Sequence, residues 1–109
     1  MIRLDESFDG GSVTLRVGQR IDLALAENAS TGYRWHPARP CPPVASPALR
    51  EIDEAFAAPG RQMPGASGIR HIYFEAVSAG NADLEFEYRR AWQAPAARSF
   101  RLRVEIHAE

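Results

Sequence analysis

Few side chains in this sequence are of a type that could carry covalent chemistry. The single cysteine, Cys41, lies among Pro40, Pro42 and Pro43, with no base close to it in the sequence. A thiol becomes a good nucleophile only where a base or a positive charge lowers its pKa. A small hydrolase built on Cys41 and His36 would need the two side chains within hydrogen-bonding distance. We therefore expect Cys41 to be a small, semi-buried filler in a stiff loop, and we expect no enzyme.

The metal-ligating and acidic side chains predict neither a metal site nor acid–base catalysis. The histidines are far apart and lack HxH or HxxxH spacing; they are His36, His71 and His107. Metal sites need such ligands to converge. A second set, the carboxylates of one predicted strand, alternates as expected of a solvated face: Asp83, Glu85 and Glu87. We expect exposed histidines, no metal and no cofactor.

The best candidates for functional residues are of types suited to non-covalent binding, and they fall in three segments. The first is Asn28-Ala29-Ser30-Thr31-Gly32-Tyr33, followed by Arg34-Trp35. The second is Gly65-Ala66-Ser67-Gly68, and the third is Arg90-Ala91-Trp92. Trp and Arg are the residue types most enriched at binding hot spots, whereas glycine permits tight, adaptable loops. The three segments therefore predict a binding surface.

The three segments resemble the loop motifs of the chagasin-like inhibitors of papain-type cysteine proteases. In that family the first loop has the pattern Asn-Pro-Thr-Thr-Gly-Tyr closely followed by Trp, the second has Gly-x-Gly-Gly and the third has Arg-Pro-Trp. All three occur here in that order, and the resemblance extends from about Gly18 to His107. It implies an immunoglobulin-like fold and reversible, competitive inhibition of a papain-like cysteine protease. The expected partner is a cathepsin L-like enzyme or a bacterial homologue.

Three positions depart from the family pattern. Ala29 and Ala91 stand where the family has proline, and Ser67 stands where it has glycine. Each missing proline frees a backbone dihedral, which costs about 0.4–1 kcal/mol if the conformation is kept. Ser67 matters only if that position has a positive φ or lies against the enzyme backbone. We expect weaker binding or a shifted range of targets.

The resemblance implies that the first loop enters the protease cleft and that the other two flank it. Thr31 lies at the tip between small neighbours, so it could approach the catalytic Cys–His pair of the enzyme without steric bulk. Gly32 would let the chain turn sharply behind it, and Asn28 would hydrogen-bond across the loop base. Trp92 would lie on an aromatic surface of the enzyme, an anchor worth about 2–4 kcal/mol.

Alternating apolar residues predict the strands that position these loops. The expected strands are residues 13–17, 21–25, 33–36, 49–56, 71–76, 83–89 and 100–107. Tyr33 and Trp35 are two residues apart and share one strand face, so at least one of them is expected in the core. Seven short strands without a helical period predict an all-β fold, an immunoglobulin-like antiparallel β-sandwich, as one domain over residues 1–109.

Strand parity brings the three segments together. If seven strands alternate in direction, the links after the second, fourth and sixth strands emerge at the same end. Those links are residues 28–32, 57–68 and 90–97. Loops at one end of a rigid sandwich form a natural binding edge. A different, proline-rich link at residues 37–47 is expected to be a stiff crossover between the sheets.

Composition and charge exclude several classes of partner, an internal disulfide and a membrane span. The chain has 109 residues with a formal net charge of -1, so it lacks the basic field of a nucleic-acid or anionic-membrane binder. Its one cysteine permits no internal disulfide. It has no apolar run near the roughly 20 residues of a membrane span. We expect a monomer with no nucleic-acid partner and no membrane partner.

The sequence is compatible with more than one cellular compartment. Residues 1–9 lack the basic-then-apolar layout of a signal peptide, which favours a cytoplasmic protein for the chain as written. A domain that follows a removed leader would instead be periplasmic or secreted, and it would keep no trace of that leader.

A binding module of another class is the main alternative. An immunoglobulin-like adhesion or carbohydrate-binding module would use Tyr33, Trp35 and Trp92 as a stacking platform. It requires these aromatic side chains to be exposed together on one surface, whereas the inhibitor needs Thr31 at a protruding tip and Trp92 on a separate flanking loop.

Overall fold

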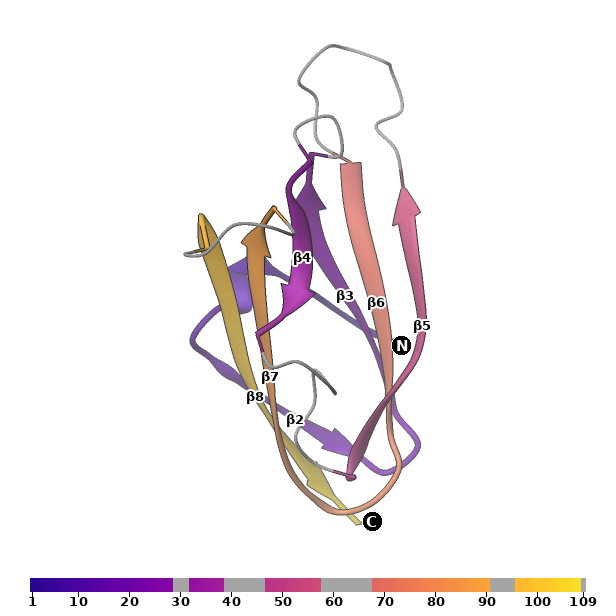
Figure 1. Ribbon diagram of the computed structural model, residues 1–109. Coiled ribbons are helices and arrows are strands. Elements are labelled where there is room, and N and C mark those ends of the chain that lie inside the picture. Colours follow the sequence, from indigo (N-terminus) through magenta and orange to yellow (C-terminus); the bar gives the residue numbers. More distant parts are fainter. Residues whose placement is uncertain (29–31, 39–46, 58–67, 91–95, 109) are drawn as a thin grey trace.

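Two four-stranded sheets enclose one hydrophobic core (Figure 1). The computed structural model describes residues 1–28, 32–38, 47–57, 68–90 and 96–108. The strands are β1 (Ile2–Asp5), β2 (Ser12–Arg16), β3 (Arg20–Glu27), β4 (Arg34–Pro37), β5 (Leu49–Ala57), β6 (Gly68–Ala76), β7 (Gly80–Arg89) and β8 (Arg98–His107), with a 3-10 turn, η1 (Glu6–Phe8), after the first. Sheet A has the order β1-β3-β6-β5, and sheet B has the order β2-β8-β7-β4.

The predicted sandwich is confirmed, with one strand more than the seven expected and with mixed instead of purely antiparallel pairing. The additional strand is β1, which pairs in parallel with β3 and buries Leu4. Between β1 and β3 the chain crosses to sheet B as β2 and returns, so β1 and β3 run in the same direction. The same crossing leaves β2 parallel to β8. β1 has only two apolar residues on its inward side, Ile2 and Leu4, and the sequence did not predict it as a strand.

The strand ends also differ from the prediction by a few residues. Pro37, Ala57 and Gly68, which the sequence assigned to links, lie in β4, β5 and β6. Val17 lies beyond β2 and is exposed, and Tyr33 precedes β4. Pairing with a neighbouring strand extends the ladder past the point where apolar alternation ends.

The core is made by the inward side chains of both sheets. On sheet A these include Ile21, Leu23 and Leu25 of β3 and Phe74 of β6, all fully buried. Alternate residues of β7 and β8 face them from sheet B, and the rings of Phe74 and Phe86 meet with centroids 6.5 Å apart. Burial of such side chains is worth about 1.5–3 kcal/mol each, so this core fixes how the two sheets stack.

The strand register brings the bases of the three predicted loops to one end of the sandwich, the upper end in Figure 1. Glu27 at the end of β3 is opposite Gly68 at the start of β6, and Ala57 at the end of β5 is opposite Ile69. In sheet B, Arg34 at the start of β4 is opposite Arg89, and Tyr88 is opposite Arg98. The common end expected from strand parity is therefore present in the described residues.

Gly68 is required by the packing of β5 against β6. A Cβ atom at this position would lie 2.5 Å from the carbonyl oxygen of Ala57 and 2.5 Å from the ring of Phe56. Both distances are below van der Waals contact, and one neighbour is backbone that cannot rotate away. The small residue type at position 68 thus follows from strand packing inside this chain.

We predict that Gly68→Ala lowers the free energy of unfolding by about 1–3 kcal/mol, because the methyl group pushes the end of β5 away from β6. Urea denaturation monitored by circular dichroism measures the change. Ala55→Ser, an exposed substitution on β5, is the control and should change stability by less than about 0.5 kcal/mol. An unchanged midpoint for Gly68→Ala would show that the β5 end adjusts without cost.

Candidate functional site

Five of the predicted site residues lie within the described part of the chain, and all five lie at the loop end of the sandwich. They are Asn28, Gly32, Tyr33, Gly68 and Arg90. Eight others fall outside the described residues, namely Ala29, Ser30, Thr31, Gly65, Ala66, Ser67, Ala91 and Trp92, and so does Cys41. The described site is therefore the set of loop bases.

The first loop connects β3 to β4. A glycine precedes β4, and the second residue of β4 is a buried tryptophan. Gly32 has φ +80°, a left-handed conformation that favours glycine, as the predicted sharp turn requires. Trp35 is 8% exposed, and its indole Nε1 donates a hydrogen bond to the carbonyl oxygen of Ala26 at 2.9 Å. The expected core role for one aromatic residue of this pair is thus confirmed at Trp35.

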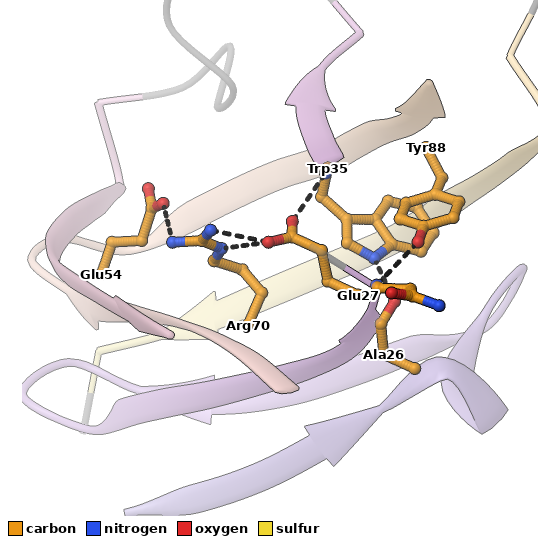
Figure 2. Close-up of polar contacts among 7 residues, drawn as sticks. Ala26, Glu27, Trp35, Glu54, Arg70 and Tyr88 are labelled. Carbon is orange, nitrogen blue, oxygen red and sulfur yellow. Dashed lines mark hydrogen bonds and ion pairs between the residues drawn. The ribbon is translucent and has the colours of Figure 1, made fainter. Parts of the chain in front are cut away.

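A buried carboxylate joins the bases of the first and second loops. Glu27, 1% exposed, accepts a hydrogen bond from the backbone N–H of Trp35 through Oε1, at 3.0 Å. Its Oε2 accepts from Nε and Nη2 of Arg70, at 3.2 and 2.6 Å. Figure 2 shows Glu27 between these two partners and Arg70 reaching on to Glu54 of β5, where Nη1 donates to Oε1 at 2.9 Å. One ion-pair network therefore contacts β3, β4, β5 and β6.

The hydrogen bonds of this network favour the charged form of Arg70. The hydrogen bond to Glu27 raises the pKa of the Arg70 guanidinium above its ordinary value, although burial acts in the opposite direction. The charged form of the Arg70 guanidinium is therefore favoured beside the Glu27 carboxylate. A buried carboxylate that lost this partner would keep its desolvation cost without compensation.

Tyr88 of β7 connects the bases of the first and third loops. Its ring packs against those of Tyr33 and Trp35, with centroids 5.4 and 5.0 Å apart. Its hydroxyl oxygen accepts a hydrogen bond from the backbone N–H of Asn28 at 2.9 Å (Figure 2). The backbone of Asn28 thus ties the base of the first loop to β7, and the predicted bond of Asn28 across the loop base stays a prediction.

Two arginines lie over this aromatic group. The guanidinium of Arg90, in the third motif, lies 4.8 Å from the centroid of the Tyr33 ring, so predicted site residues from two different loops contact each other. The guanidinium of Arg98 lies 4.7 Å from the Tyr88 ring, and Nη1 of Arg98 donates to Glu6 at 2.9 Å. Cation–π contacts of this kind are worth about 0.5–1 kcal/mol at exposed sites and more where water is excluded.

Glu27 and Arg70, the main residues that hold this end together, were not among the predicted site residues. The sequence does contain a signal for these two residues, because each is a charged residue that stands in line with the alternating apolar residues on the core face of its strand. Glu27 follows Leu23 and Leu25 at the same parity, and Arg70 precedes Ile72. Opposite charges at inward positions of two strands predict a buried pair, provided that the strands are neighbours.

The other titratable groups do not form a reaction site among the described residues. His71, expected to be exposed, is only partly exposed, and its Nδ1 lies 2.7 Å from Oδ1 of the buried Asp22. His36 is partly buried as well, whereas His107 is exposed as expected. The expectation of exposed side chains was therefore wrong for His36 and His71; His71 is partly covered because it contacts Asp22 of the neighbouring strand β3.

The described residues contain neither a cluster of metal ligands nor a helix that could span a membrane. No group of three His, Cys, Asp or Glu side chains is placed to hold a metal ion in the part of the chain that the structure describes. Within the same residues, none of the helical structure is long and apolar enough to span a bilayer.

The described residues form a two-sheet sandwich in which the bases of the three predicted loops lie at one end. Comparison with known proteins gives the family. The profile "Chagasin family peptidase inhibitor I42" matches residues 14–104, and the chain belongs to this family of peptidase inhibitors. The family consists of inhibitors and not of enzymes, as the sequence predicted.

Individual relatives are distant in sequence but match over nearly the whole chain. Chagasin of Trypanosoma cruzi is 23% identical over 106 residues, which cover 97% of this chain and 96% of chagasin. Amoebiasin-1 of Entamoeba histolytica is 30% identical over 105 residues, covering 94% and 97%. The crystal structure of a cysteine protease inhibitor from Entamoeba histolytica superposes with a TM-score of 0.74 at 22% identity, covering 97% of this chain and 94% of that one.

We predict that Tyr88→Phe lowers the free energy of unfolding by about 1 kcal/mol, because the Asn28 amide loses its acceptor while the ring contacts remain. Hydrogen exchange followed by NMR should show faster exchange of the Asn28 amide. The control is Tyr73→Phe, since the Tyr73 hydroxyl makes no hydrogen bond with any described residue, and it should leave stability and exchange unchanged. Equal exchange rates at Asn28 in Tyr88→Phe and in the wild type would contradict the assigned bond.

Proposed function

We propose that this domain is a reversible, competitive inhibitor of papain-like cysteine proteases that closes the active-site cleft with its three loops. The observation that carries the proposal is the common end of the sandwich, where the bases of the three motif-bearing segments are joined by the Glu27 and Tyr88 contacts. Membership of the chagasin family supports the inhibitory activity, and a structural relative is described as a cysteine protease inhibitor.

The proposed mechanism is occlusion without chemistry. The first loop enters the cleft with Thr31 at its tip, and the small side chains of Ala29 and Ser30 let it approach the catalytic Cys–His pair of the enzyme. Because Gly32 turns the chain sharply and Glu27 and Tyr88 hold the loop base, little conformational entropy is lost on binding. Such preorganisation converts a modest contact area into affinity.

The second and third loops are proposed to flank the cleft. In the third loop, Trp92 is the proposed hot spot, and its neighbour Arg90 is held over the Tyr33 ring. In the second loop, Gly65, Ala66 and Ser67 are the proposed contacts. Gly68 has a structural role in β6 as well, because its small size is needed by β5.

The stacking-platform alternative is disfavoured by burial. Trp35 is 8% exposed and uses its indole N–H inside the protein, and Tyr33 packs against Tyr88. Two of the three aromatic side chains that a sugar-binding platform would need therefore serve to hold the loop bases.

Titration of papain, and of a cathepsin L-like enzyme, with the purified domain and a fluorogenic peptide substrate tests the proposal. Saturable inhibition that is reversed on dilution, and that raises the apparent KM without changing the maximal rate, is the expected result. Absence of inhibition at about 100 μM, with a β-rich circular dichroism spectrum confirming the fold, would exclude any complex tighter than about 5.5 kcal/mol and so reject the proposal.

We predict that Trp92→Ala weakens inhibition of papain at least tenfold and leaves the melting temperature nearly unchanged, because its proposed role is a contact with the protease. The inhibition constant and Tm are measured on the same preparation. The control is Val77→Ala, a substitution of a partly exposed apolar residue in the link between β6 and β7, away from the loop end. If Trp92→Ala and Val77→Ala inhibit equally well, Trp92 is not the anchor.

A further inference from the structure

Glu27 and Arg70 lie where the strands that carry the first two loops converge. Glu27 is the last residue of β3, directly before the first loop, and Trp35 is the second residue of β4, directly after it. Arg70 is the third residue of β6, shortly after the second loop, and Glu54 lies on β5 shortly before that loop. The network in Figure 2 thus contacts the strands on both sides of each loop.

The two carboxylate oxygens of Glu27 have separate partners. Oε1 accepts from the backbone of β4 and Oε2 accepts from the guanidinium on β6, so one planar group sets the distance between these two strands. Arg70 is further located by the ring of Phe56 on β5, 5.1 Å from its guanidinium carbon. The planar guanidinium and the planar carboxylate restrict orientation as well as distance.

Stability alone does not explain a charged pair at this place. Replacing a buried ion pair by uncharged residues of similar size is often neutral or stabilising, whereas removing one partner is strongly destabilising. A hydrophobic pair would pack against its neighbours without fixing an orientation. What this pair adds is a defined placement of β4 and β6, and therefore of the loops that precede them.

We infer that the Glu27–Arg70 pair is a positioning device that holds the bases of the first and second loops in one relative placement, and that tight inhibition depends on this placement. The inference rests on the proposed function, because it assigns the pair a role in presenting the inhibitory loops. The two residues do not contact the protease; they act through the loops.

The test is the neutral double variant Glu27→Gln/Arg70→Met. The introduced glutamine keeps an acceptor for the Trp35 amide and the introduced methionine keeps an unbranched chain, so the variant is expected to fold. Arg70→Met alone is not suitable, since it leaves the Glu27 charge buried without its partner. The control is Glu54→Gln, which removes only the outer, half-exposed ion pair, of a kind that contributes little.

Two readouts on the folded double variant decide the inference. Hydrogen exchange of the amides of residues 34–36 and 68–71 is expected to become at least tenfold faster, while that of residues 82–86 in β7 stays unchanged. The inhibition constant for papain is expected to rise at least tenfold, and Glu54→Gln is expected to stay within twofold of the wild type. Wild-type exchange and wild-type inhibition in the double variant would overturn the inference and leave the pair a purely structural role.

Measurements of inhibition by the wild-type protein distinguish a failure of the proposed function from a failure of this inference. If the wild type does not inhibit papain or a cathepsin L-like enzyme, the proposed function and the dependence of inhibition on the pair both fail. The exchange measurement then decides the positioning role by itself, because it needs no protease. Faster exchange at both loop bases supports positioning, and unchanged exchange overturns it.

Discussion

An ionised carboxylate can leave water only if another charge balances it and hydrogen bonds satisfy its oxygens, and this requirement organises the loop end of the sandwich. The side chain of Glu27 is 1% exposed, and its partners come from β4 and β6. To satisfy this one group, the end of β3, the start of β4 and the start of β6 must keep a fixed arrangement. The first and second loops connect to these strands, so the same arrangement fixes the positions of their bases.

The third loop is tied to the same arrangement by aromatic and cationic groups. Tyr88 accepts a hydrogen bond from the residue that follows Glu27, and its ring packs on Tyr33 and Trp35. Arg90 and Arg98 lie over these rings on either side of the third link. Tyr33 and Arg90 belong to the motifs of two separate loops, and yet their side chains contact each other. Part of the first motif and part of the third motif therefore contribute to the packing of the loop bases.

Some residues that match the family motifs also have a role inside the fold. The three departures, Ala29, Ser67 and Ala91, lie outside the described residues, as do the matching residues Thr31, Gly65 and Trp92. Gly32, Tyr33, Gly68 and Arg90, which match the family, each have an internal reason in the fold: a positive φ, a ring contact, a close strand and a cation–π contact. These four residue types are therefore required by the packing of this chain itself.

The sequence by itself determined the strands with strong alternation, the common end of the three links and the turn at Gly32, because these depend on local periodicity and backbone sterics. Only the tertiary structure decided what depends on neighbours distant in the chain. It added β1, whose two inward apolar residues are too few to stand out, and it set the parallel pairings, which follow from the crossing between sheets. It also paired Glu27 with Arg70, 43 residues later, since two charged residues on core faces reveal a partnership only when the register between their strands is known.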